Sequence, residues 1–291
     1  MILFLLACDP IGSLTRESLG ADPASRYQVH VFEKTRTPNG GLWRRTTPAI
    51  AHAFSSLHAV VWNNELVICG LGSARPPTRV EERFPRLGVG ALVTGDGKTW
   101  TTKSWAVDAP GVSLIDPAIV EGPEGEELWF VQADGLGDPG QQGTAVKIVR
   151  TKWNGERFNN ATVWAVGTGL VDPSPVWFGG AWHVFATRDH ASVVRVEEGG
   201  ATREVLAGAT VPFTRAVGSQ IVLIAQRMGD GGMLPVVTRS PDAIAWSAAE
   251  PALPVDVTSG RGPPPPLRTC TSAVTATFAG AEVLVCVEEA R

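Results

Sequence analysis

The stretch Gly169–Asp189, GLVDPSPVWFGGAWHVFATRD, indicates the fold of the whole chain. Valine and aromatic residues, which favour strands, lie on both sides of Gly179-Gly180, a pair suited to a tight hairpin turn. Asp172-Pro173 stands where the first strand begins, and a proline there removes no hydrogen bond from the ladder. The stretch therefore predicts one β-hairpin.

The same plan recurs elsewhere in the chain. Segments with a strand, a turn and a second strand lie at 55–72, 113–134, 211–227 and 271–289. A hairpin that recurs every few dozen residues is typical of radial β-repeats, and with the weaker strands that follow it each repeat holds about four strands, the size of a propeller blade. Glycine and proline interrupt every longer window, which argues against helices.

Counting the repeats gives complete blades at about 57–106, 116–166, 172–207 and 211–248. The strand pairs 27–45 and 271–289 remain, and neither can bury its faces alone. Joined, they form a fifth blade with the C-terminal pair inside and the N-terminal pair outside, which removes exposed sheet edges. The sequence thus predicts an all-β, five-bladed β-propeller over residues 27–291.

Residues 1–26 predict a different role. Leu5-Leu6-Ala7-Cys8 resembles the lipobox of bacterial lipoproteins, in which the cysteine becomes the lipidated first residue. Residues 9–26 lack periodicity and have the composition of a flexible tether. The alternative is an apolar strand with an incidental Cys8. We expect an extracytoplasmic protein, in the periplasm or at the cell surface, that contacts the membrane only through the lipid. The sequence does not determine which residue is the true N-terminus.

Composition limits the partners. The chain has 291 residues and a net charge of −4, and it contains no cluster of lysine and arginine, which argues against nucleic acid as a partner. No apolar run reaches the length of a membrane span. No group of His, Cys, Asp or Glu has the spacing of a metal site, so we expect no metal and no cofactor, and we expect a monomer.

Two aspartates are the main candidates for chemistry. The first strand of each propeller blade lines the central channel, and sites form at one mouth of that channel. Alignment of the hairpins on their turns places Asp116 and Asp172 at one position of adjacent blades, with Ser56, Ser272 and Val211 completing the ring. Ser56 and Ser272 are therefore candidate ligand-binding residues. Two carboxylates in one funnel raise each other's pKa, which suits acid–base chemistry. The alternative is that each aspartate only caps its own strand.

LIDPAIV (114–120) and LVDPSPVWFGGAWHVFAT (170–187), set in five blades, resemble the five-bladed glycoside hydrolases. That group includes the arabinanases and β-xylosidases of family 43, the invertases and fructanases of family 32 and the mannoside phosphorylases of family 130. The resemblance covers residues 50–290 in pattern and implies acidic residues on the inner strands of three blades. Asp116 and Asp172 supply two of them. Glu121 lies in a Glu-Gly-Pro tripeptide that mimics a family signature around the acid. It falls at a hairpin turn, about 16 Å along the strand from Asp116, and is not expected to be the acid.

The remaining candidates each have a structural alternative. Arg215 on an inner strand is a candidate clamp for an acidic group, and a solvated or ion-paired arginine is the alternative. His58 near the channel is a candidate ligand-binding residue or base, and a hydrogen-bonded structural histidine is the alternative. TGDGKTW (94–100) and SPDAIAW (240–246) resemble Asp boxes, in which Asp96 and Asp242 cap backbone N–H groups of a turn.

Three cysteines besides Cys8 leave the redox state open. Cys69, Cys270 and Cys286 are odd in number and imply no disulfide framework. Cys69 and Cys286 lie on second strands of blades that closure makes neighbours, so an oxidising compartment would permit a bond between them. Buried free thiols are the interpretation that we favour.

Two functions follow from these observations. The favoured one is a membrane-tethered, glycosidase-like propeller that binds a carbohydrate or surface ligand without established catalysis, because the third carboxylate is not identifiable. The alternative is a glycoside hydrolase that acts on plant or microbial polysaccharide through Asp116 and Asp172. Three converging carboxylates at the mouth would favour the enzyme, and two or fewer would favour the binding protein.

Overall fold

The computed structural model describes residues 27–35, 42–45, 51–52, 54–72, 88–109, 114–133, 139–229, 232–252 and 270–289. Strands and their turns make up this part of the chain, with no helix, and hence no helix that could cross a membrane. Cys8 and the predicted tether lie outside the described residues.

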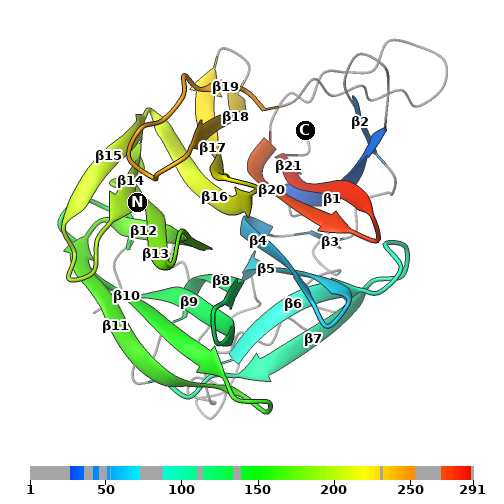
Figure 1. The fold of residues 1–291 in the computed structure, drawn as a ribbon, viewed down its shortest axis with the longest axis horizontal. Helices are drawn as coiled ribbons and strands as arrows, with labels where there is room; N and C mark the ends of the chain where they lie inside the picture. Colours follow the sequence, from blue (N-terminus) through cyan, green and yellow to red (C-terminus); the bar gives the residue numbers. More distant parts are fainter. Residues whose placement is uncertain are drawn as a thin grey trace, which may run out of the picture.

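The described strands form five sheets around one axis, with the first strand of each blade nearest the centre (Figure 1). Blade 1 consists of β4 (Phe54–Trp62), β5 (Glu65–Gly72), β6 (Gly88–Thr94) and β7 (Thr101–Ala106). Blade 2 consists of β8 (Ile115–Gly122), β9 (Gly125–Ala133), β10 (Ala145–Trp153) and β11 (Phe158–Thr168). Blade 3 consists of β12 (Leu170–Phe178), β13 (Ala181–Arg188), β14 (Ser192–Val196) and β15 (Thr202–Ala207). Blade 4 consists of β16 (Ala209–Val217), β17 (Gln220–Gly229), β18 (Gly232–Ser240) and β19 (Glu250–Pro251).

The fifth sheet, which we call the closing blade, joins the two ends of the described chain. Its order from the centre is β20 (Cys270–Phe278), β21 (Ala281–Glu289), β1 (Tyr27–Thr35) and β2 (Leu42–Arg45), with β3 (Ala51–His52) as a further partner of β1. The antiparallel register of β1 on β21 runs from Tyr27↔Glu289 to Glu33↔Val283. The predicted five-bladed fold and its closure are confirmed.

The hydrophobic core is divided into layers between neighbouring blades. Strand β9 contains the uninterrupted apolar run LWFV at residues 128–131, and its position between two core layers explains that run. Leu128 and Phe130 pack in the cluster shared with blade 1, whereas Trp129 and Val131 pack in the cluster shared with blade 3. Side chains alternate across a strand, so a blade covered on both faces requires apolar residues at every position. All four side chains are fully buried.

Two tight turns contain the predicted capping aspartates. The backbone N–H groups of Lys98 and Thr99 donate to Oδ1 of Asp96 at 2.8 and 2.7 Å. These bonds hold the pKa of Asp96 well below its usual range. Asp242 accepts the N–H groups of Ile244 and Ala245 in the same way, both at 2.8 Å. Both carboxylates are therefore used within their own turns.

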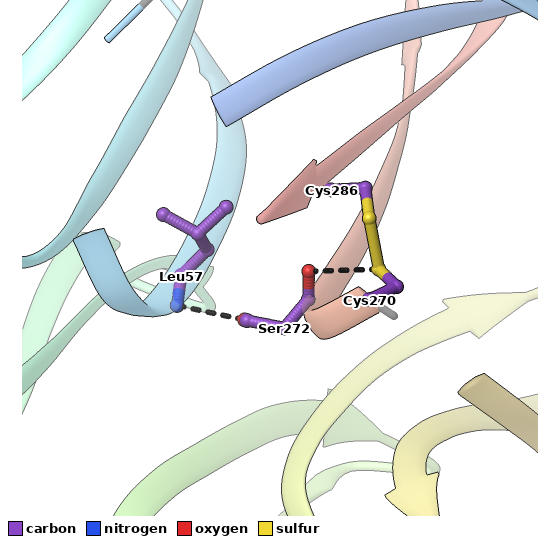
Figure 2. The surroundings of a disulfide bond; sticks show 4 residues. All are labelled: Leu57, Cys270, Ser272 and Cys286. Atoms are coloured by element: carbon purple, nitrogen blue, oxygen red, sulfur yellow. Dashed lines mark hydrogen bonds between the residues drawn. A yellow bond between two sulfur atoms is a disulfide. The ribbon is translucent and has the colours of Figure 1, made fainter. Parts of the chain in front are cut away.

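The structure corrects the prediction for the cysteines. Cys270 and Cys286 form a disulfide within the β20–β21 hairpin, with 5.8 Å between their Cα atoms (Figure 2). They are neither free thiols nor paired through Cys69, which is buried and free. The reason is local geometry, because β20 starts at Cys270 and lies beside β21, whereas the Cys69 thiol points toward blade 2 and donates to the carbonyl of Pro117 at 3.3 Å.

Candidate functional site: the axial mouth

Each inner strand carries an irregularity near its start, where the pairing with the second strand shifts. In β8, β12 and β16 the first residue of this bulge is Asp116, Asp172 or Val211, with φ values of 50°, 53° and 49°. A proline follows each of the three. We call the rim formed by these bulges the mouth. The three residues hold equivalent positions in adjacent blades, because both their strand position and their backbone conformation agree.

Asp116 joins blade 2 to blade 3. The backbone N–H of Asp172 donates to Oδ2 of Asp116 at 3.1 Å, and Asp116 is only 8% exposed. A hydrogen bond to a carboxylate is stronger than one between neutral groups. Asp116 therefore binds the backbone of the inner strand in the next blade.

Asp172 continues this connection into blade 4. The hydroxyl of Thr187 donates to Oδ2 of Asp172 at 2.7 Å, and the same hydroxyl oxygen accepts the N–H of Val211 at 2.7 Å. Thr187 lies on β13 and is completely buried, whereas Asp172 is partly exposed. Sequence reasoning missed Thr187, although its position opposite the bulge of β12 was a usable signal. A single chain of hydrogen bonds thus joins the three mouth positions.

We call the boundary between two neighbouring blades a seam. Side-chain hydroxyl groups form hydrogen bonds across two of the seams. The N–H of Leu57 in blade 1 donates to Oγ of Ser272 in the closing blade at 3.0 Å, as Figure 2 shows. Between blades 3 and 4, the N–H of Thr214 donates to Oγ of Ser174 at 2.7 Å. Ser272 is 1% exposed, so the predicted ligand-binding hydroxyl is occupied by a contact between blades. Ser56 lies in the bulge of β4, and its side chain is outside the described residues.

The two other seams also use a second-strand side chain. Cys69 of β5 makes the bond to Pro117 in the bulge of β8, and burial raises the pKa of its thiol to about 12. Gln226 of β17 faces the closing blade, with its amide nitrogen donating to the carbonyl of Cys270 and its oxygen accepting the N–H of Ala273. Hydrogen bonds to inner-strand backbone groups therefore join the blades at all five seams.

His58 lies in the interior, between inner strands of different blades. Its ring meets Phe213 of β16 edge-on, with 5.1 Å between centroids, and the residue is 5% exposed. Burial lowers the pKa of His58 to about 4, and the nearby backbone of Ile119 offsets part of this effect. Neither ring nitrogen has a hydrogen-bond partner of good geometry among the described residues. His58 therefore stays neutral at physiological pH, and a role in ligand binding stays a prediction.

Arg215 lies away from the aspartates. It is four residues beyond Val211 on β16, about 13 Å along the strand. Its guanidinium lies 3.3 Å from Oε1 of Glu282, whose other oxygen accepts Nζ of Lys34 at 2.7 Å. Lys34 and, to a lesser degree, Arg215 lower the pKa of Glu282. The structure thus gives Arg215 an ion pair near the hairpin turns and does not bring it together with Asp116 and Asp172.

A buried carboxylate at the other end of blade 2 was not predicted. Glu127 is 3% exposed, and its Oε2 has no hydrogen-bond partner among the described residues, with Nη1 of Arg150 at 4.0 Å. Burial raises its pKa, and Arg150 opposes that effect. The guanidinium of Arg150 also lies over the rings of Trp129 and Trp164, at 5.7 and 5.8 Å. Within the described part of the chain, no three His, Cys, Asp or Glu residues are grouped so that they could hold a metal ion.

Comparison with known proteins identifies the fold. No protein-family model matches the sequence, and no curated protein matches it. An exo-β-1,3-galactanase from Phanerochaete chrysosporium, solved with β-1,3-galactotriose, superposes with a TM-score of 0.50 at 11% identity. The chain has the fold of the family 43 glycoside hydrolases. The superposition covers 89% of this chain and 64% of the galactanase, so the chain spans less than two thirds of that enzyme.

Other solved structures are also similar. An α-L-arabinanase from Cellvibrio cellulosa superposes with a TM-score of 0.49 at 13% identity, over 81% of this chain and 88% of the arabinanase. The predicted resemblance to five-bladed glycoside hydrolases is confirmed for the fold. The mouth holds Asp116 and Asp172 in blades 2 and 3, and the equivalent position of blade 4 holds Val211.

Proposed function

We propose that this chain is an exported, lipid-anchored propeller that binds a carbohydrate at the mouth without glycosidase chemistry. The observation that carries the proposal is the arrangement of Asp116, Asp172 and Val211 at one rim of a family 43 fold. Two carboxylate groups in adjacent blades offer acceptors to the hydroxyl groups of a sugar. The galactanase with the same fold was solved with a neutral galactotriose, which supports carbohydrate as the ligand class.

The bonding of the aspartates supports binding over hydrolysis. Glycoside hydrolysis uses one carboxyl group as acid and a second as base or nucleophile, and the bond between sugars lies between them. At this mouth Oδ2 of Asp116 accepts a backbone N–H and Oδ2 of Asp172 accepts the hydroxyl of Thr187. One oxygen of each carboxylate is therefore engaged by a donor of the protein itself. The third position offers the apolar side chain of Val211 instead of an acid.

Export and anchoring rest on two further features. Leu5-Leu6-Ala7-Cys8 has the lipobox pattern, and the disulfide of the closing blade suits an oxidising compartment. Mass spectrometry of the product exported from a bacterial host should show a diacylglycerol on Cys8. An unmodified Cys8 after export would refute the anchor and leave the binding proposal to its own test.

The second candidate function is a glycoside hydrolase acting through Asp116 and Asp172. The observation in its favour is that both carboxylates lie on adjacent inner strands of a fold used by hydrolases. It requires an acid from a position other than the three equivalent ones. Release of reducing sugar therefore separates the two functions.

The experiment measures binding and hydrolysis on one set of probes. Isothermal titration with β-1,3-galactotriose, arabinotriose and xylotriose should show reversible binding of at least one probe, and chromatography should show no shortened product. Asp116→Asn and Asp172→Asn should each weaken binding and leave the melting temperature nearly unchanged, because the amide oxygen of asparagine still accepts the hydrogen bond.

Asp242→Asn is the matched control, since that carboxylate also accepts backbone N–H groups but lies in a turn of blade 4. It should leave binding unchanged. Shortened product from the wild type that disappears in Asp116→Asn would replace the proposal by the hydrolase. If none of the three probes binds, the proposal that the mouth binds a neutral glycan of this class is refuted.

A further inference from the structure

Val211 has a backbone conformation that does not suit its side chain. Its φ of 49° lies in the left-handed region, where aspartate and asparagine are tolerated and a β-branched residue is an outlier. The equivalent residues Asp116 and Asp172 are of the tolerated type. The chain therefore holds a strained valine at one of three equivalent places, although a better-suited residue occupies the other two.

The ordinary structural reasons for a valine do not apply at this place. None of the hydrophobic clusters of the described residues includes Val211, and its side chain is partly exposed. The contact with Thr187 uses the backbone N–H, which every residue except proline would provide. Neither the core nor the seam between blades 3 and 4 requires the isopropyl group.

We propose that Val211 is a specificity-determining residue of the mouth, whose isopropyl group packs on the C–H face of the sugar that Asp116 and Asp172 bind. The inference rests on the proposed carbohydrate function. Strained residues persist mainly where function requires them, and small-molecule sites combine apolar walls with a few oriented polar groups. Radial symmetry turns the side chain of Val211 toward the same rim as the two aspartates, and the chain from Asp172 through Thr187 ties the positions together.

The test is Val211→Asn, which keeps the backbone N–H, suits the left-handed conformation and removes the apolar contact. The melting temperature should rise by about 2–4 °C through relief of strain. The affinity for β-1,3-galactotriose or arabinotriose, whichever binds the wild type, should fall by about tenfold, the loss typical of a small apolar contact. Val211→Ile keeps both the strain and the contact, so its melting temperature and affinity should stay close to the wild type.

Ala243→Gly is the control for a change of backbone strain elsewhere. Ala243 also has a left-handed φ, 61°, but lies in the turn after β18 and should not affect binding. If Val211→Asn is stabilised and binds as well as the wild type, the strain has no function in binding and the inference is wrong. If it loses stability and affinity together, the side chain has a packing role and the inference is also wrong. If the wild type binds no probe, the proposed carbohydrate function is refuted, and the inference, which depends on it, is refuted as well.

Discussion

The buried imidazole of His58 should make the propeller sensitive to mild acid. Its pKa is lowered from 6.5 to about 4 by burial, so the folded protein disfavours the protonated form that the unfolded chain takes up below pH 6.5. The contribution of neutral His58 to the free energy of unfolding is complete above pH 6.5, decreases as the pH falls, and is lost once the pH drops below about 4. At about 1.36 kcal/mol per pH unit, the loss across this window is about 3 kcal/mol.

The assay is urea unfolding of the wild type and of His58→Leu at intervals between pH 7 and pH 4.5. Leucine cannot titrate and leaves no buried polar atom, so the variant should lose much less free energy of unfolding across this range. The carboxylates with lowered pKa values, such as Asp96 and Glu282, lose their contributions mainly below this range. His183, whose pKa is also lowered but which is only half-buried, provides the control His183→Gln, with a smaller effect. An equal loss in the wild type and in His58→Leu would refute the reasoning.

Three other predictions concern the stability of the blades. Replacing both Cys270 and Cys286 by alanine should lower the free energy of unfolding by about 3 kcal/mol, the value expected for a disulfide that closes a loop of this length, and reduction of the wild type should have the same effect in urea unfolding. Glu127→Gln should raise stability at neutral pH, because burial raises the pKa of the carboxyl and disfavours its ionised form; the gain should shrink as the pH falls from the raised pKa of the folded protein toward the usual value for glutamate, and a loss at pH 7 would contradict this account. Phe130→Ala should cost about 3–5 kcal/mol, whereas Val163→Ala, at a residue 52% exposed, should change stability by less than about 0.5 kcal/mol in the same denaturation assay.

The blade architecture was predictable because its signals are local. Turn pairs such as Gly179-Gly180 and the apolar run at 128–131 act through backbone conformation and alternation, which a sequence displays directly. Closure followed from the two leftover strand pairs, because neither 27–45 nor 271–289 had a partner for its edges. Even the equivalence of Val211 to the two aspartates followed from the spacing to the turns.

Contacts between side chains of different strands were not predictable in this way. The pairing of Cys270 with Cys286 depends on where β20 begins, which differs by one residue from the predicted strand and changes which thiols can meet. The ion pair of Arg215 with Glu282 joins residues 67 positions apart, at the hairpin ends of two strands.

The sequence by itself determined the number of blades, their order and their closure, because strand alternation and turn chemistry are properties of neighbouring residues. The tertiary structure alone decided that Asp116 bonds the backbone of Asp172, that Thr187 links Asp172 to Val211, and that valine takes a left-handed conformation there. These features depend on contacts between residues that lie 15 to 56 positions apart in the sequence and meet only when the strands and blades pack together.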